Sequence, residues 1–277
     1  MKIAVVSGKG GVGKTSVAVS LVLARGSGTI VDCDVEEPNV ALLLNPVIEG
    51  KEVAKKPVPK VMEDLCDRCK VCAEACQFNA IMVLPNTVII FEKMCHSCGV
   101  CSYVCPKGAI KEEERDIGEI EWGRCGNILY WGGRLNIGEA MATPLISAVK
   151  KRAAGDPVVV DSPPGITCPM VEAVEGSDFV VVVAESSAFG LHDFRLLREY
   201  ISGMDVPFGV LENKLGMSPY PVIEEFCRKE GVLYLGAIPY RGDFASAYAE
   251  GIPLINADAT LRDLFEDIWR RIEVEAS

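Results

Sequence analysis

A glycine-rich stretch near the beginning of the chain has the residue types needed to bind phosphate. It fits the pattern G-x-x-x-x-G-K-[ST] from Gly8 to Thr15, between an apolar strand candidate at residues 3–6 and an amphipathic run at residues 17–23 that suits a helix. Glycines allow backbone N–H groups to point at phosphate oxygens, and a helix N-terminus adds partial positive charge. Lys14 is expected to reach the outer phosphates, and the Thr15 hydroxyl to coordinate Mg²⁺. The expected nucleotide-binding residues are Gly8, Gly10, Gly11, Val12, Gly13, Lys14, Thr15 and Ser16.

A second lysine, Lys9, lies inside this pattern. The run Gly-Lys-Gly-Gly-Val-Gly-Lys-Thr resembles the deviant Walker A motif of the MinD, ParA and nitrogenase-iron-protein group of ATPases. The resemblance implies a homodimer around ATP, in which Lys9 reaches the nucleotide of the other subunit and Lys14 that of its own. Both lysines are therefore candidate catalytic residues. The alternative for Lys9 is an exposed loop lysine without a partner.

Twelve cysteines are many for a chain of 277 residues, and eight of them form a tandem repeat. The spacing C-x2-C-x2-C-x3-C begins at Cys66 and recurs at Cys95, so that each cysteine has a counterpart 29 residues later. This is an internal duplication with the spacing of bacterial ferredoxins that carry two [4Fe–4S] clusters. The candidate metal ligands are Cys66, Cys69, Cys72, Cys76, Cys95, Cys98, Cys101 and Cys105.

The ferredoxin resemblance also implies how the ligands are shared. In two-cluster ferredoxins the fourth cysteine of each run binds the other cluster, so Cys105 would complete the first cluster and Cys76 the second. One departure from the pattern is Gln77, which stands where the first run should have a proline, whereas Pro106 is present in the second. Paired C-x-x-C motifs also form tetrahedral zinc sites, but two such four-cysteine runs in tandem fit cubane clusters better.

Carboxylates follow two of the apolar strand candidates. Asp32 and Asp34 come after residues 29–31, and Asp161 comes after residues 157–160. The carboxyl ends of parallel strands face the crevice in which such sheets bind ligands. Asp34 resembles the switch I aspartate of the MinD group, which acts on the attacking water, and Asp161 resembles its Walker B aspartate, which binds a water on Mg²⁺. Asp32 either lies near the Mg²⁺ shell or satisfies local backbone groups.

The same resemblance extends to three further nucleotide contacts. Gly165 could offer its N–H to the γ-phosphate, Asn213 matches a residue that contacts adenine, and Pro239 borders the base. Cys168 follows Asp161 at the distance of a cluster-binding cysteine in the nitrogenase iron protein, so it could hold a bridging cluster, with Cys125 as a possible companion. The more ordinary interpretation of both is a thiol without a metal.

Composition narrows the classes of partner. With 28 basic and 39 acidic residues the net charge is −11, which argues against nucleic acid and against an anionic membrane surface. Residues 260–277 have apolar residues at helical spacing but a net charge of −2, so a helix docked on the core is favoured over a membrane anchor. Without a signal sequence or an apolar run long enough to span a bilayer, the chain is expected to be cytoplasmic.

The alternation of strand and helix patterns predicts an α/β fold with a mostly parallel, doubly wound sheet. Residues 1–56 and 117–277 are expected to form the ATPase domain, and residues 57–116 an inserted ferredoxin-like α+β module. The prolines and lysines of residues 45–60 indicate an exposed linker, residues 121–136 an irregular packed loop, residues 81–91 a hairpin, and residues 139–153 a helix.

These features together predict an ATPase that couples its nucleotide state to electron transfer through two [4Fe–4S] clusters, with a redox protein as partner. An alternative is a protein that assembles or carries a metallocluster and delivers it to an acceptor, in which case the cluster is cargo. A third possibility, a MinD-like positioning protein, is disfavoured by the acidic C-terminal run and leaves the cysteines unexplained.

Overall fold

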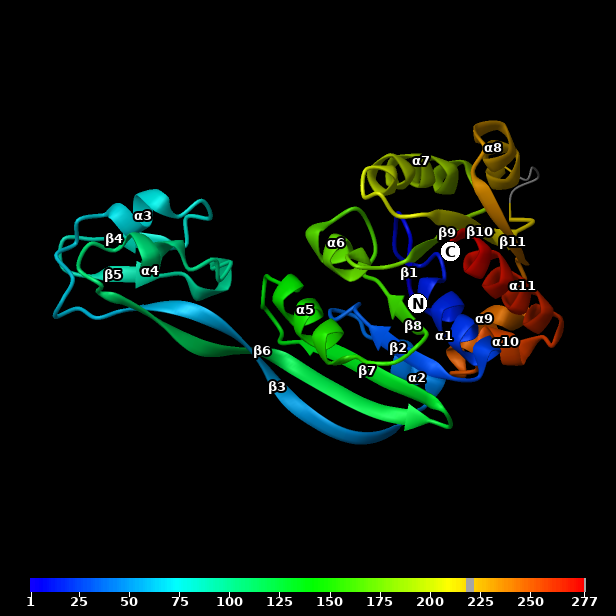
Figure 1. Cartoon of the computed structure of the whole chain (residues 1–277), viewed down its shortest axis with the longest axis horizontal. Coiled ribbons are helices and arrows are strands. Elements are labelled where there is room, and N and C mark those ends of the chain that lie inside the picture. Colours follow the sequence, from blue (N-terminus) through cyan, green and yellow to red (C-terminus); the bar gives the residue numbers. More distant parts are fainter. Residues whose placement is uncertain (218–221, 277) are drawn as a thin grey trace. The chain divides into compact units, whose positions relative to one another are not determined.

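The computed structural model describes residues 1–217 and 222–276. The chain divides into two compact units, which are drawn in Figure 1. Unit 1 comprises Met1–Lys51, Ile120–Arg134 and Ile146–Ser277, and unit 2 comprises Glu52–Glu119 and Leu135–Leu145. The chain therefore passes from one unit to the other four times.

A nine-stranded sheet runs in the order β11-β10-β9-β1-β8-β2-β7-β6-β3. From β11 to β7 every neighbouring pair is parallel. Strand β9, an interior strand of this order, is buried along its whole length, because both faces of a parallel sheet are covered by helices. The strands are β1 (Lys2–Val6), β2 (Gly28–Asp32), β3 (Val47–Val61), β6 (Ile110–Cys125), β7 (Ile128–Leu135), β8 (Val158–Asp161), β9 (Phe179–Glu185), β10 (Phe208–Leu215) and β11 (Leu233–Pro239).

Helices flank this sheet, with α6, α7 and α8 on one side and α1, α10 and α11 on the other (Figure 1). The helices of unit 1 are α1 (Lys14–Arg25), α2 (Val40–Leu44), α5 (Thr143–Arg152, shared with unit 2), α6 (Cys168–Val174), α7 (Ala188–Ser202), α8 (Val222–Glu230), α9 (Gly242–Ala249), α10 (Leu254–Ala257) and α11 (Thr260–Glu275). None of the helices in the described part of the chain has the length and apolar character needed to cross a bilayer.

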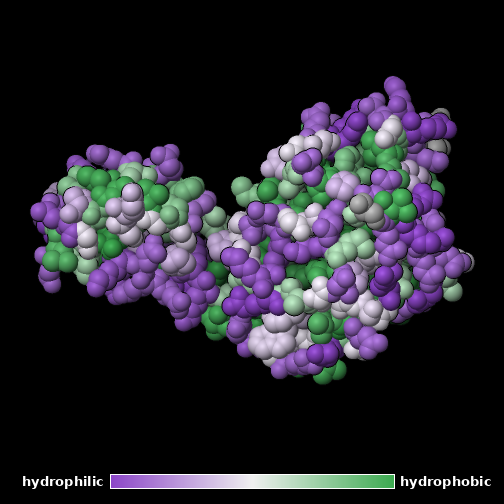
Figure 2. Space-filling model, viewed as in Figure 1, coloured by the Kyte–Doolittle hydropathy of each residue, from purple (hydrophilic) through white to green (hydrophobic). Residues whose placement is uncertain are grey.

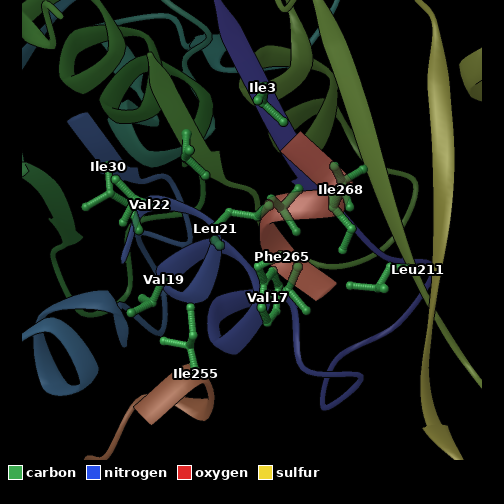
Figure 3. Packing of buried hydrophobic residues seen from close by; sticks show 14 of the residues in the cluster. Ile3, Val17, Val19, Leu21, Val22, Ile30, Leu211, Ile255, Phe265 and Ile268 are labelled. Carbon is green, nitrogen blue, oxygen red and sulfur yellow. The ribbon is translucent and has the colours of Figure 1, made fainter. Parts of the chain in front are cut away.

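Helices α1 and α11 pack against each other at the centre of the core. Figure 3 shows Val17 and Leu21 of α1 close to Phe265 and Ile268 of α11. The indole N–H of Trp269 donates to the Leu21 carbonyl oxygen at 2.8 Å, which satisfies its only polar group inside the core. The expected docking of the C-terminal helix on the core is therefore confirmed.

Unit 2 contains two short helices, α3 (Val71–Ala75) and α4 (Val100–Val104), a 3₁₀ turn at Glu92–Met94, and the antiparallel hairpin of β4 (Ile81–Val83) and β5 (Val88–Ile90). The hairpin was expected from the sequence. The duplication is visible in the backbone, since each positive φ in the first half recurs 29 residues later. The matched pairs are Arg68 and Ser97, Lys70 and Gly99, and Asn79 and Gly108.

The expected linker at residues 45–60 is wrong, because most of it forms strand β3. Pro57 and Pro59 are tolerated because β3 lies at the end of the sheet order, where a strand edge needs no partner for its N–H groups. Lysines of β3 pair with glutamates of β6 across the strands. The pairs are Lys51–Glu121 at 3.0 Å, Lys55–Glu114 at 3.2 Å and Lys60–Glu113 at 2.7 Å.

The expected irregular loop at residues 121–136 is also wrong, because it forms the end of β6 and all of β7. Trp122 and Trp131 stack with ring centroids 5.4 Å apart. A side chain at Gly50 would collide with Trp122, so the glycine makes room for the indole. The helix expected at residues 139–153 begins later, at Thr143, and Glu139 lies in the loop before it.

Figure 2 shows hydrophilic residues over much of the visible face of each unit, which agrees with the net charge of −11.

Candidate functional site

The phosphate loop lies between β1 and α1 and is braced by the end of β10. Gly13, directly before α1, has φ 102°, which is a region that favours glycine. A Cβ there would lie 2.4 Å from the Asn213 side-chain nitrogen. That nitrogen donates to the Val12 carbonyl oxygen at 2.6 Å. Asn213 therefore fixes the loop itself, besides lining the cavity beside it.

A cavity of about 400 Å³ opens beside this loop, within the size range of small-molecule sites. Nine of the residues predicted for the nucleotide site line this cavity: Gly10, Gly11, Gly13, Lys14, Thr15, Ser16, Asp34, Asn213 and Pro239. Five others, Gly8, Lys9, Val12, Asp161 and Gly165, are not among its lining residues.

Six further residues line the cavity beyond Pro239. They are Tyr240, Arg241, Phe244, Ala245, Tyr248 and Leu254, and the aromatic Phe244 and Tyr248 are spaced by one turn of α9. The Arg241 guanidinium lies over the Phe244 ring at 4.4 Å and pairs with Asp243 and Asp258. From the sequence, only the segment around Pro239 was expected to lie beside the base. The i, i+4 aromatic pair that directly follows it was the signal that could have extended the site.

Asp161 at the end of β8 is a fully buried carboxylate that lies beside the Thr15 hydroxyl. Within the described residues neither of its oxygens accepts a hydrogen bond of normal geometry. Burial raises the pKa of Asp161 to about 7, against the opposing effects of the Lys14 ammonium and the Thr15 hydroxyl. Burial also raises the pKa of Asp34, and Lys14 again opposes it. Two unsatisfied acceptor oxygens beside Thr15 fit a hydrated Mg²⁺.

The Asp32 carboxylate binds backbone N–H groups. Its two oxygens accept hydrogen bonds from the N–H groups of Asp34 at 3.1 Å and Val40 at 3.0 Å. Burial raises its pKa well above the usual range, and the charge of Asp161, its register partner on β8, raises it further. Of the two interpretations of Asp32, this geometry favours the backbone one.

Lys9 is not a lysine without a partner. Its ammonium lies 3.1 Å from a Glu185 carboxylate oxygen and 4.0 Å from one of Asp193. Glu185 also pairs with Lys214 at 3.1 Å. Burial would raise the pKa of Glu185, but hydrogen bonds from Lys214, Lys9 and Ser187 outweigh it and the pKa is lowered. The role of Lys9 in a second subunit stays a prediction.

Gly165 differs from the expectation that its N–H is available to a phosphate. The N–H donates to the Ser7 carbonyl oxygen at 3.0 Å, and φ is 83°. In this structure the segment after Asp161 is thus tied to the phosphate loop, and the Gly165 N–H would have to leave Ser7 before it could contact a nucleotide.

Two small hollows in unit 2 are each lined by four cysteines. Cys66, Cys69, Cys72 and Cys105 surround the first, and Cys76, Cys95, Cys98 and Cys101 surround the second. Each group combines three cysteines of one run with the fourth cysteine of the other. The membership equals the two ligand sets that the ferredoxin spacing implies, and the binding of iron there stays a prediction.

Backbone N–H groups point at three of these sulfur atoms. Ala80 donates to Cys76 and Ala109 to Cys105, at 3.4 and 3.3 Å, in equivalent positions of the duplication. Ser97 donates to Cys95 at 3.4 Å. Hydrogen bonds to sulfur stabilise thiolates and help to set the potential of a cluster.

A single metal ion does not fit these groups. Among residues 1–217 and 222–276, no three His, Cys, Asp or Glu side chains are close enough to hold one ion. Zinc bound at about 2.3 Å would bring its sulfurs within about 4 Å of each other. A cubane instead binds each thiolate through a different iron, so its ligands are spread around it. The choice of cubane clusters over zinc at these cysteines stays a prediction from their spacing.

An ion-pair group lies beside the second hollow. The Lys56 ammonium contacts Glu139 at 2.9 Å and donates to the Cys95 carbonyl oxygen at 3.2 Å. Arg115 contacts the other oxygen of Glu139 at 2.6 Å. The Glu139 pKa is lowered because hydrogen bonds from these two cations outweigh the effect of burial. His96 stacks on Phe78 with ring centroids 3.5 Å apart.

The two remaining candidate cysteines differ in exposure. Cys168 is exposed at the start of α6, and Cys125 at the end of β6 packs against the core of unit 1. An additional cluster at these thiols stays a prediction.

A protein-family model and several known proteins match most of this chain. The model of the CobQ/CobB/MinD/ParA nucleotide binding domain matches residues 3–254. An uncharacterised protein of Methanocaldococcus jannaschii is 32% identical over 285 residues, with 99% of this chain and 96% of that protein covered. A protein of Pyrococcus horikoshii named "Iron-sulfur cluster carrier protein" is 25% identical, with 92% of this chain and 79% of that protein covered.

Solved structures give the same fold. The septum site-determining protein MinD complexed with Mg-ADP from Pyrococcus horikoshii matches with a TM-score of 0.60 at 17% identity, over 99% of this chain and 96% of that chain. The cell division ATPase MinD of Pyrococcus furiosus matches with a TM-score of 0.58 at 19% identity, over 98% of both chains. The expected mostly parallel phosphate-loop fold is confirmed.

Proposed function

Because the chain belongs to the CobQ/CobB/MinD/ParA nucleotide-binding family, we propose that it is an ATPase that couples its nucleotide state to electron transfer through two [4Fe–4S] clusters. The observation that carries the proposal is that one chain combines the phosphate-loop cavity with two hollows, each lined by four cysteines.

The nucleotide half of the proposal rests on the residues around the cavity. Backbone N–H groups of the phosphate loop and the Lys14 ammonium bind the phosphates of ATP, and the Thr15 hydroxyl and Asp161 hold hydrated Mg²⁺. Asp34, whose charge faces Lys14, orients the attacking water. Tyr240, Phe244 and Tyr248 offer aromatic surface to the base and ribose.

The expectation of a dimer rests on Lys9. In the single chain Lys9 pairs with the carboxylates of Glu185 and Asp193, and it can leave these for a phosphate bound to a second subunit. Two chains around two nucleotides would then form the active ATPase. The segment that contains Gly165 would exchange its hydrogen bond to Ser7 for a nucleotide contact at the same time.

The redox half rests on the two cysteine hollows. A cubane supplies one-electron chemistry when bound, and the chain supplies the thiolates and the N–H donors that hold it. Complete sets of four thiolates favour resident clusters, because a cargo site needs an open face. A redox protein would accept the electron.

A second candidate function is delivery of a metallocluster to an acceptor protein. It is favoured by the similarity to proteins named iron-sulfur cluster carrier protein. In that case the exposed Cys168 would be the site of a labile cluster. Transfer of iron to an apo-acceptor, with loss of iron from this chain, separates this function from electron transfer.

Anaerobic reconstitution followed by EPR spectroscopy and redox titration tests the main proposal. We expect about eight iron atoms per chain and a cluster potential or spectrum that changes on addition of Mg-ATP. Lys14→Ala, which removes the phosphate contact and lies far in sequence from the eight candidate cluster cysteines, should keep the iron and lose the response to ATP. Clusters whose reduction is indifferent to ATP in the wild type would reject the coupling.

A further inference from the structure

The two cysteine hollows share a feature besides their thiols. Arg68 and Ser97 occupy equivalent positions of the duplication, and each directly precedes the second cysteine of its run. Their backbones have the same left-handed conformation, with φ 58° for Arg68 and 55° for Ser97. Arg68 lines the first hollow and Ser97 the second. Two unlike side chains therefore start from the same place relative to their cysteines.

Each of these side chains has a buried polar atom without a partner. The Arg68 Nε atom and the Ser97 Oγ atom are buried from solvent, and neither forms a hydrogen bond with any residue that the structure describes. The far end of the Arg68 guanidinium does have a neighbour, a Glu63 carboxylate oxygen at 3.5 Å, so it is the inner N–H that lacks an acceptor. An unpaired buried donor is unfavourable, and its recurrence at equivalent positions indicates that a bound group supplies the acceptor.

The cysteine sulfur atoms do not fill this role by themselves. Backbone N–H groups donate to Cys76, Cys95 and Cys105, yet no cysteine in the described part of the chain accepts from Arg68 Nε or Ser97 Oγ. A single metal ion held by the thiolates would bring no acceptor atom. A [4Fe–4S] cluster brings four sulfide sulfur atoms, which accept hydrogen bonds.

We propose that Arg68, through Nε, and Ser97, through Oγ, each donate a hydrogen bond to a sulfur atom of the [4Fe–4S] cluster in its own hollow. This rests on the proposed function, because it requires both clusters to be present. Hydrogen bonds to sulfur stabilise the more negative, reduced state of a cluster. The Arg68 donor is cationic and the Ser97 donor is neutral, and a charge-assisted hydrogen bond is about twice as strong as a neutral one. The two donors therefore raise the two reduction potentials by unequal amounts.

Anaerobic redox titration of the reconstituted full-length chain with titanium(III) citrate, followed by EPR, tests this role. Each cluster takes up one electron from titanium(III), which becomes titanium(IV). Arg68→Lys keeps the positive charge but puts a methylene group in the place of Nε. It should lower the potential of one cluster by about a factor of ten in the equilibrium between reduced and oxidised cluster, which is about 59 mV for one electron. Ser97→Ala should lower the potential of the other cluster by about a factor of three, because its donor is neutral.

Two further variants serve as controls. Lys107 also lines the first hollow, but its side chain is 56% exposed, so Lys107→Met should leave both potentials unchanged. Ser97→Gly removes the same hydroxyl as Ser97→Ala, and glycine adopts the φ of 55° without strain. It should lower the same potential by the same amount as Ser97→Ala.

Iron content separates the two proposals. A wild-type chain that does not bind about eight iron atoms would reject the clusters themselves. With full iron content, wild-type potentials in Arg68→Lys and in both Ser97 variants would reject the hydrogen bonds and leave the proposed function standing. Substitutions of Arg68 and Ser97 that lower the potential of the same cluster would reject the assignment of one donor to each hollow.

Discussion

Asp161 carries a buried carboxylate that accepts no hydrogen bond of normal geometry from the described residues. A buried charge without a partner costs several kcal/mol, and a protein avoids the cost by protonating the group or by binding a cation. In the chain alone the pKa of Asp161 is raised, which favours the protonated carboxyl. When Mg²⁺ is bound, the cation with its water shell would stabilise the ionised carboxylate instead.

A pH dependence of stability follows at this residue. The folded pKa of Asp161 is about 7 and the unfolded value about 3.8, so between these values the folded state holds a proton that the unfolded state has lost. The free energy of unfolding should therefore fall as pH rises through this window, by about 1.4 kcal/mol per pH unit for one group. Asp161→Asn should remove this contribution, as measured by denaturant unfolding at pH 5 and pH 7.

The control for this measurement is Asp64→Asn, at an exposed position. It should follow the wild type at both pH values. A wild type and an Asp161→Asn variant with the same pH dependence would contradict the burial of an unsatisfied carboxylate. Mg-nucleotide should also reduce the loss of stability between pH 5 and pH 7, because the cation favours the charged carboxylate.

Lys9 and Lys14 should be separable by experiment, since they contact different groups. Lys9→Ala should keep the binding of ATP to the single chain and lose ATP-dependent dimerisation, because only the second subunit would need that lysine. Lys14→Ala should lose both. Fluorescent nucleotide binding measures the first property and sedimentation velocity the second. Dimerisation of Lys9→Ala with ATP at the wild-type concentration would rule out the role across subunits.

At the scale of elements, the docking of α11 on the core was correctly predicted from the sequence, and the structure shows that its partner is α1. The apolar spacing of the C-terminal run was visible, and its acidic charge separated a core helix from a membrane anchor. Phe265 is fully buried in this contact. Phe265→Ala should destabilise the chain by about 3–5 kcal/mol, as measured by equilibrium unfolding.

Phe189 provides the matched control for this substitution. It is also a helical phenylalanine, on α7, but 79% of it is exposed. Phe189→Ala should change the free energy of unfolding by less than about 0.5 kcal/mol. Equal effects of the two substitutions would contradict the assignment of α11 to the core.

Some elements of the fold could be predicted from the sequence and others could not. The phosphate loop, the strands around it and the repeat of 29 residues are local patterns, and all could be predicted. Strand β3 was missed because prolines and lysines suggest a linker, whereas an edge strand accepts the prolines and glutamates of β6 neutralise the lysines. The β6–β7 segment was missed because the space that Gly50 leaves for Trp122 comes from a distant part of the chain.

The site was predicted in the same uneven way. Nine predicted residues line the nucleotide cavity because motif residues are fixed by short-range backbone geometry. The aromatic residues of α9 were missed because only the fold brings that helix to the cavity. The ion pair of Lys56 with Glu139 joins residues 83 positions apart, so no local sequence pattern predicts it.

At the scale of the whole molecule, the chain alternates between its two units instead of visiting each once. Unit 2 is completed by Leu135–Leu145, which supplies Glu139 to Lys56. The expected insert at residues 57–116 contains neither member of this buried pair.

This alternation limits how the cysteine module can be transplanted into another protein. A gene fragment for residues 52–119 would encode all eight cysteines but would leave the Lys56 ammonium without its carboxylate, and a broken buried pair typically costs about 3–5 kcal/mol. We expect limited proteolysis to digest that fragment quickly, and a fusion that restores residues 135–145 through a flexible tether to resist. The segment with the eight cysteines therefore cannot be grafted onto another protein by itself, and the segment that carries Glu139 has to be included in the graft.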